Sequence, residues 1–141
     1  FVPGKALTLW HPPAGGKKPQ VAIIGCGPLL YQALVAARDL EADGIGTMVV
    51  DCHTVKPIDE AAIVAAAKKC GAVVSVEEHQ VIGGLGGAVA ELLARRAPTP
   101  MEFIGLQDTF GESGPPKALI EKYGMGTKDI KAAVKRVLRK K

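Results

Sequence analysis

Short runs of consecutive apolar residues alternate along the chain with longer stretches in which apolar residues recur every three or four positions. The short runs predict strands, and the longer stretches predict helices with one core-facing stripe. The predicted strands cover residues 6–10, 20–25, 47–51, 72–76 and 101–106. The first predicted helix begins within residues 26–30, and the second covers residues 60–70. The third runs from Leu85 through Leu93, the fourth covers residues 115–123, and the fifth begins after a cap at Thr127.

The order of these elements predicts a mostly parallel sheet. Helices separate the later strands, and such crossovers place strands in parallel with helices on both faces. Residues 11–19 hold three prolines and two glycines, which disfavour regular structure. This segment is therefore too short and too rich in helix-breaking residues to form a crossover helix. The first strand is therefore expected to run antiparallel. We predict an α/β fold with three α/β/α layers.

The length favours one domain over residues 1–141. A chain of this size has one sizeable core and is short for two. Within it, residues 1–19 would form the first strand and the loop rich in proline and glycine, and residues 20–141 the α/β core.

Several residues mark helix ends. Asp59 is placed to cap the second predicted helix, and Ile58 and Ile63 occupy the two positions of a hydrophobic staple. Gly44 and Gly71 follow the last periodic residues of the first and second helices, where a left-handed residue commonly ends a helix.

The net charge of +4 is unevenly distributed. Residues 128–141 hold seven lysines or arginines against Asp129 alone, so acids outnumber bases by two in the remainder. A basic tail is a candidate for nucleic-acid binding. A solvated helix face with its cations at the dipole-favoured C-terminal end explains it better, and we expect no nucleic-acid partner.

Cysteine usage and hydropathy bear on location. Cys26, Cys52 and Cys70 show no CxxC or metal-ligand spacing and fall in or beside predicted buried elements, as expected of small hydrophobes in a reducing compartment. No run of 18 apolar residues occurs, and no charged-then-apolar leader opens the chain. We expect a cytoplasmic protein with no membrane partner. The start at Phe1, without methionine, suggests a fragment, a processed chain or a trimmed one.

Gly25-Cys26-Gly27 follows a predicted strand and invites a dinucleotide-binding interpretation. The fingerprint is G-x-G-x-x-G, however, and Leu30 stands where its third glycine belongs. Asp51 does lie at the end of the next strand, where a ribose-binding acid would sit. With the third glycine missing, a plain tight turn is favoured.

Residues 73–91 form the stretch that carries most of the candidate chemistry. They predict a strand, then the cluster Glu77, Glu78 and His79, then a helix that begins among glycines. A carboxylate beside a histidine can act as an acid/base pair, and a glycine-rich helix start can bind an anion. The alternative is a polar strand end that meets solvent or another subunit. Adjacent residues of an extended segment also point to opposite faces, which separates Glu78 from His79.

Five segments together resemble the C-terminal domain of transketolases. In chain order, which is also the family's order, they are Val55–Asp59, Val76–His79, Gly83–Glu91, Asp108–Gly114 and Tyr123-Gly124. The resemblance extends over about residues 5–138. It implies a five-stranded mixed sheet with one antiparallel strand, in agreement with the hydrophobic pattern.

The resemblance also implies a function for the complete enzyme. Transketolases move a two-carbon ketol unit between sugar phosphates in the pentose phosphate pathway, using thiamine diphosphate and Mg²⁺. In that family the cofactor lies between the two other domains at a dimer interface. This chain would then contribute no catalytic, cofactor-binding or metal-binding residue. Its partners would be the N-terminal and pyrimidine-binding domains or subunit of a homodimer.

Two relatives and one different class stay open. The β subunits of 2-oxo-acid dehydrogenases and deoxyxylulose-phosphate synthase carry the same domain, although Asp108–Gly114 followed by Tyr123-Gly124 fits transketolase better. A free-standing nucleotide-binding or regulatory module is the alternative of another class.

The resemblance favours an interface over an active site in residues 73–91. A domain without catalytic residues must still dock on its neighbours, and glycines permit close backbone approach. The predicted interface residues, which would face another domain or subunit, are Glu78, His79, Gly83, Gly84, Gly86 and Gly87.

Overall fold

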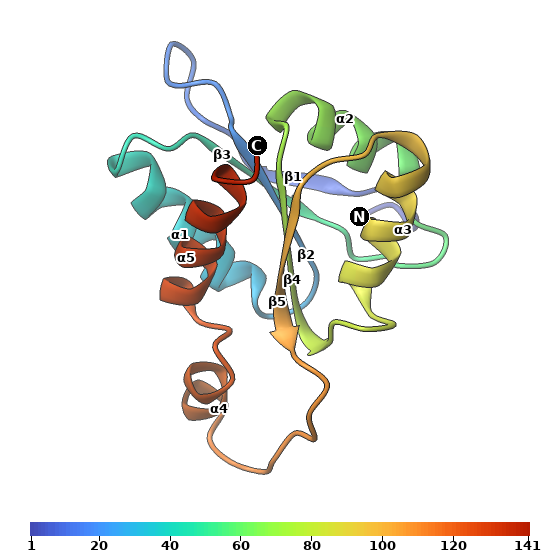
Figure 1. Cartoon of the computed structure of the whole chain (residues 1–141), viewed down its shortest axis with the longest axis vertical. Coiled ribbons are helices and arrows are strands. Elements are labelled where there is room, and N and C mark those ends of the chain that lie inside the picture. Colours follow the sequence, from blue (N-terminus) through green and yellow to red (C-terminus); the bar gives the residue numbers. More distant parts are fainter.

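The computed structural model describes all 141 residues and contains five strands and five helices (Figure 1). The strands are β1 (Leu7–Trp10), β2 (Val21–Gly25), β3 (Thr47–Asp51), β4 (Val73–Gln80) and β5 (Met101–Leu106). The helices are α1 (Leu30–Ala42), α2 (Glu60–Cys70), α3 (Leu85–Arg96), α4 (Pro116–Lys122) and α5 (Thr127–Leu138).

The five strands form one sheet in the order β1-β3-β2-β4-β5. The pairs β2–β3, β2–β4 and β4–β5 are parallel, and β1 pairs antiparallel with β3. Figure 1 shows α1 and α5 on one face of the sheet and α2 and α3 on the other, while α4 stands apart beyond the end of β5. The predicted three-layer α/β/α fold with one antiparallel strand is confirmed.

Two apolar cores lie on the two faces of the sheet, and β2 shows how they arise. Val21 and Ile23 pack with α1 and α5, whereas Ala22 and Ile24 pack with α2 and α3. All four side chains are fully buried. A central parallel strand covered on both faces has no polar side, which explains its unbroken apolar run.

Most predicted helix ends are confirmed. Asp59 caps α2, since its Oδ1 accepts the Ala62 N–H at 3.2 Å. Its Oδ2 accepts the Ala6 N–H at 3.1 Å, so the same carboxylate also fixes the chain that leads into β1. Gly44 and Gly71 adopt φ values of 78° and 74°, which favour glycine at these helix ends.

The predicted cap at Thr127 is wrong. The N-cap of α5 is Gly126, whose N–H donates to Asp129 Oδ2 at 3.1 Å. Thr127 is the first helical residue, and its hydroxyl instead donates to Gln32 Oε1 on α1 at 2.6 Å. A tertiary partner thus draws the threonine side chain away from the local role that its position suggested.

Strand β4 is longer than its apolar run. The pattern predicted a strand that ends at Val76, but extended structure continues to Gln80, with a register irregularity against β5 between these two residues. The acidic residues that follow the apolar run therefore belong to a strand and alternate between its two faces.

Candidate functional site

The carboxyl ends of the four parallel strands lie at one edge of the sheet. From β2 the chain continues to β3, which lies on one side of β2, and later to β4, which lies on the other side. The strand order therefore reverses at β2. In open α/β sheets, ligands bind outside the carboxyl ends at such a reversal. The stretch from Glu77 to Gly87 lies at this edge, which makes it the place to test for a site.

Glu77 is the buried charged group of this edge. Its side chain is 2% exposed, Oε2 accepts the Leu85 N–H at 2.7 Å, and Oε1 accepts the Gly86 N–H at 2.8 Å. A helix N-terminus attracts an anion, and the chain supplies that anion itself. The anion site suggested by the glycine-rich helix start is therefore already filled by Glu77.

Two glycines around Glu77 are required by contacts within the chain. A Cβ added at Gly84 would lie 2.1 Å from Glu77 Oε2 and 2.3 Å from the Gln80 carbonyl oxygen. At Gly86 it would lie 2.7 Å from Ser75 Oγ and 2.9 Å from Phe103 Cδ1. Gly84 and Gly86 thus let α3 approach β4 and the buried carboxylate closely.

The other two glycines of the predicted interface have more space. Gly83 adopts a φ of 81°, and a Cβ built there meets nothing within 4 Å. A Cβ at Gly87 would be 3.5 Å from the Val81 carbonyl oxygen, an ordinary contact. The need for glycine at Gly83 comes from its backbone conformation, and nothing within the chain demands it at Gly87.

Glu78 and His79 do not form a catalytic pair within this chain. Both are exposed, and as consecutive strand residues they project from opposite sides of β4. His79 is 67% exposed, with Nδ1 at 3.0 Å from the Gln80 carbonyl oxygen and 4.0 Å from Glu77 Oε2. Glu77 in turn is held by α3. The side chains of Glu78 and His79 point into solvent and can contact another protein surface.

Gln80 is a structural residue that the sequence analysis missed. Its Nε2 donates to the Thr109 carbonyl oxygen at 2.5 Å, and its Oε1 accepts the Asp108 N–H at 3.1 Å. The side chain therefore ties the loop after β5 to the end of β4. Neither partner is near it in sequence, so no local pattern could have indicated these contacts.

Exposed large apolar side chains surround the same edge. We call six of them the apolar rim. Four follow the carboxyl end of a parallel strand. The other two precede β1, which runs antiparallel and so begins at the same end of the sheet, with Leu7 paired to Asp51 at the end of β3. Phe110 is 96% exposed and Ile82 is 76% exposed. The members of the apolar rim are Phe1, Val2, Tyr31, Val55, Ile82 and Phe110. Such a concentration at one edge is typical of a surface that contacts another protein surface.

Two other properties concern ligands and membranes. No group of three or more histidine, cysteine, aspartate or glutamate side chains gathers in a way that could hold a metal ion. None of the five helices has the length and apolar character needed to span a bilayer.

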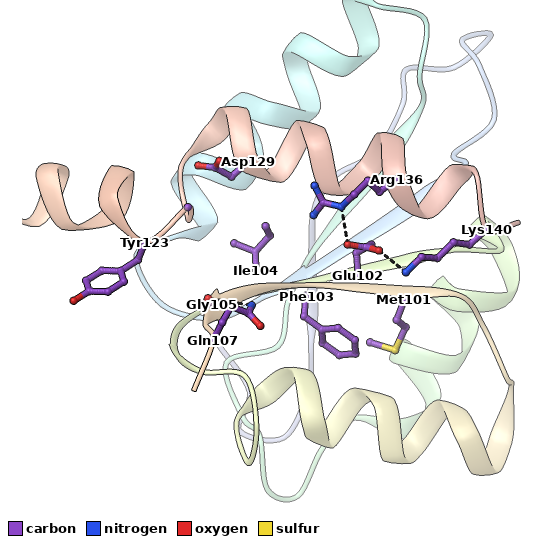
Figure 2. Close-up of a pocket in the computed structure, with 11 residues that line it drawn as sticks. Met101, Glu102, Phe103, Ile104, Gly105, Gln107, Tyr123, Asp129, Arg136 and Lys140 are labelled. Carbon is purple, nitrogen blue, oxygen red and sulfur yellow. Dashed lines mark hydrogen bonds and ion pairs between the residues drawn. The ribbon is translucent and has the colours of Figure 1, made fainter. Parts of the chain in front are cut away.

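A cleft of about 450 Å³ runs along β5 beside α5, from Met101 at the start of the strand to Gln107 just beyond its carboxyl end (Figure 2). Glu102, 14% exposed, lies at its centre between Arg136, whose Nε is 2.9 Å from Oε2, and Lys140, which contacts Oε1. Burial alone raises the pKa of Glu102, but the hydrogen bonds and charges of Lys140 and Arg136 outweigh it and lower the pKa. The cleft's cations are thus engaged by an internal carboxylate, and it offers no strong site for an anion.

This ion-pair cluster predicts a pH-dependent contribution to stability. Because the pKa of Glu102 is lowered by folding, its stabilisation is fully present above the ordinary glutamate pKa of about 4.3 and is lost as the pH falls through the folded value. We expect Glu102→Gln to reduce the free energy of unfolding at pH 7, and to reduce it less at pH 3, where protonation of Glu102 has begun to remove the same interaction. Urea unfolding at both pH values measures this. Glu121→Gln, on the exposed face of α4, is the control, and an equal loss at both pH values would contradict the prediction.

Together, the fold and the site define an α/β/α domain in which the N-terminus of α3 is hydrogen-bonded to the chain's own Glu77. The exposed apolar rim lies at the carboxyl ends of its strands. The family model described as "Transketolase, C-terminal domain" matches residues 15–130. The chain belongs to this family.

The similar proteins agree with this assignment. The 6-deoxy-6-sulfo-D-fructose transketolase subunit SqwH of Clostridium sp. (strain MSTE9) is 45% identical over 141 residues, which are 100% of this chain and 42% of that protein. A 1-deoxy-D-xylulose-5-phosphate synthase 1 of Geobacter sulfurreducens is 38% identical over 84% of this chain and 19% of its own length. A solved structure described as a split gene transketolase, inactive beta4 tetramer, superposes with a TM-score of 0.88 at 45% identity, covering 99% of this chain and 44% of that one. The chain thus spans less than half the length of these proteins.

Proposed function

We propose that this chain is the C-terminal portion of a thiamine-diphosphate-dependent transketolase, in which it supplies docking and assembly while other domains supply the chemistry. The complete enzyme would transfer a two-carbon ketol unit between sugars that carry an anionic group. The observation that carries the proposal is the end-to-end match with a transketolase subunit of which this chain covers 42%.

The geometry of the carboxyl edge supports a docking role. Its one buried carboxylate is bonded to the chain's own α3, and its exposed side chains include the apolar rim, Glu78 and His79. The rings of Phe1 and His53 lie 4.3 Å apart at this edge. A domain that precedes Phe1 in a longer protein would therefore join the chain beside the rim, and we propose the pyrimidine-binding domain as the surface that covers it.

Thiamine diphosphate and Mg²⁺ do not fit the residues of this chain. A diphosphate needs free donors or cations and Mg²⁺ needs converging oxygen ligands, whereas the start of α3 is bonded to Glu77 and no metal-ligating group assembles. We therefore place the cofactor and the metal on the other domains. The residues of this chain take part in no step of the ketol transfer.

Activity of the complete enzyme tests the proposed function. The longer protein that contains this chain, with any separate subunit that supplies its cofactor domain, is expected to transfer a ketol unit in the presence of thiamine diphosphate and Mg²⁺. Because SqwH is described by its sulfo-sugar substrate, fructose 6-phosphate and 6-deoxy-6-sulfo-D-fructose are both tested as donors. Synthesis of deoxyxylulose phosphate, or decarboxylation of a 2-oxo acid, would instead assign one of the related enzymes.

Substitutions at the docking surface are predicted to weaken assembly more than chemistry. In the complete enzyme, we expect Ile82→Ala to raise the dissociation constant of the assembly about tenfold, because it removes an apolar side chain from a covered contact. His79→Ala is expected to act in the same direction. Turnover of the enzyme that remains assembled should change little in either case. Sedimentation velocity across a dilution series, with activity measured at saturating protein, separates the two effects.

A matched control lies within the sheet, on the edge strand β1. Leu9 on β1 is an exposed aliphatic residue outside the apolar rim, and Leu9→Ala should leave the assembly unchanged. Unchanged dissociation for His79→Ala together with a large loss of turnover would show that this histidine serves catalysis.

The free-standing module is tested by binding to this chain alone. Equilibrium binding of nucleotides, sugar phosphates and thiamine diphosphate should show no tight complex if the chain only docks. The turn at Gly25–Gly27 is short, with Gly27 at a φ of 71° and the Leu30 N–H donating to its carbonyl oxygen at 3.2 Å. Tight nucleotide binding would favour the module.

A further inference from the structure

Two of the three cysteines are neighbours at the carboxyl edge of the central strands. Cys26 directly follows β2 and Cys52 directly follows β3. The last register pair of these parallel strands is Gly25 with Asp51, and the Cys52 N–H donates to the Gly25 carbonyl oxygen at 2.8 Å. The two cysteines therefore lie beside each other, one residue beyond the end of the ladder.

Their side chains project from the same face of the sheet. Ile24 in β2 and Val50 in β3 form a register pair, and both pack in the core beneath α2 and α3. Two residues further along each strand the side chains return to that face, which is the face of Cys26 and Cys52. Cys52 is a member of this core and Cys26 packs against it.

The spacing of the strands matches what a disulfide spans. Neighbouring strands lie roughly 4.7–4.9 Å apart, and disulfides join Cα atoms separated by roughly 4.4–6.8 Å. Because both residues lie beyond the last ladder pair, their Cβ atoms can approach without breaking a register pair. The third cysteine, Cys70, ends α2 near the start of β4 and is remote from this edge.

We propose that Cys26 and Cys52 are a redox modification site, which a low-molecular-mass disulfide such as oxidised glutathione converts into an intrachain disulfide. Cys26 is half-buried and reacts first, whereas Cys52 is 1% exposed. The Cys26 thiolate attacks one sulfur of glutathione disulfide, which forms a mixed disulfide and releases one glutathione. The Cys52 thiolate then attacks the Cys26 sulfur, which forms the Cys26–Cys52 bond and releases the second glutathione. The chain loses two hydrogen atoms, and the oxidant gains them.

The surroundings of the two cysteines make their oxidation slow at neutral pH. Burial raises the pKa of the Cys26 thiol, and the nearby carboxylates of Glu77 and Asp51 add to the effect. Burial likewise raises the pKa of Cys52 to about 11, with further contributions from Cys26, Asp51 and Asp59. Because the thiolate is the attacking species, the reaction should accelerate as the pH rises from 7 to 9. This proposal concerns the chain by itself, in which no other domain covers the carboxyl ends of β2 and β3.

The test exposes the purified chain to oxidised glutathione at pH 8.5, followed by acid quenching, alkylation of free thiols and peptide mapping without reduction. We expect one linked peptide pair that joins Cys26 to Cys52, with Cys70 alkylated and two glutathione molecules released per chain. Dithiothreitol should restore three alkylatable thiols. A lasting mixed disulfide on Cys26, a bond to Cys70, a bond between chains or no reaction would each overturn the proposal.

Three variants separate the steps. Cys52→Ala should stop at the mixed disulfide on Cys26, and Cys26→Ser should give no product because Cys52 is buried. Cys70→Ala, which removes the remote thiol, should behave as the unchanged chain. Circular dichroism melting establishes that each variant is folded before oxidation. A linked product in the Cys26→Ser variant would also contradict the mechanism.

Discussion

Glu77→Gln is expected to lower the free energy of unfolding by about 2–4 kcal/mol, the largest loss that we predict for a near-isosteric change in this chain. The glutamate gives one oxygen to the Leu85 N–H and the other to the Gly86 N–H. Glutamine replaces one of those acceptors with a donor, so one backbone N–H at the start of α3 loses its partner in a buried site. The loss of the negative charge also removes its interaction with the helix dipole. Urea unfolding at pH 7 measures the effect.

The neighbouring residue provides the control. Glu78 lies on the exposed side of the same strand, and Glu78→Gln should change the free energy of unfolding by less than about 0.5 kcal/mol. Equal effects of the two substitutions would mean that the Glu77 carboxylate does not hold the start of α3.

Gly84→Ala is expected to cost about 3 kcal/mol. The new Cβ would overlap both Glu77 Oε2, at 2.1 Å, and the Gln80 carbonyl oxygen, at 2.3 Å. The carbonyl is backbone and cannot rotate away, so α3 must shift and lengthen the two hydrogen bonds to Glu77. Urea unfolding again measures the loss, and hydrogen exchange of the Leu85 and Gly86 amides should accelerate with it.

Gly87→Ala is the matched control and should have the opposite sign. Gly87 lies in α3, where a Cβ would make only an ordinary contact 3.5 Å from the Val81 carbonyl oxygen. Alanine is the better helix former, so this substitution should stabilise the isolated chain by about 0.5–1 kcal/mol. If Gly87 instead packs against another domain, the same substitution should weaken assembly of the complete enzyme while it stabilises the chain.

The contrast between Gly84 and Gly87 also separates two explanations that the sequence could not distinguish. Four glycines around α3 are compatible with a close approach to a partner surface and equally with a close approach inside the domain. The structure assigns Gly84 and Gly86 to internal contacts with Glu77 and its neighbours. Gly83 and Gly87, together with Glu78 and His79, remain predicted to contact a partner.

The sequence by itself determined the layers, the order of strands and helices along the chain and the direction of β1, because these depend on local periodicity and on connection length. The continuous apolar run of β2 required cover on both faces, and the broken loop at residues 11–19 excluded a crossover helix. Asp59 could be assigned as a cap because its N–H partner is three residues away. The family resemblance added the class of enzyme.

Only the tertiary structure decided what the stretch around Glu77 does. The hydrogen bonds from Leu85 and Gly86, eight and nine residues along the chain, depend on how α3 returns to β4. The pairing of Gln80 with residues 108 and 109 and the proximity of Cys26 to Cys52 arise from strand order. Periodicity specifies which face of an element is apolar, but it does not specify which elements become neighbours. A buried carboxylate can be recognised as a structural anion only when the helix that donates to it is in place.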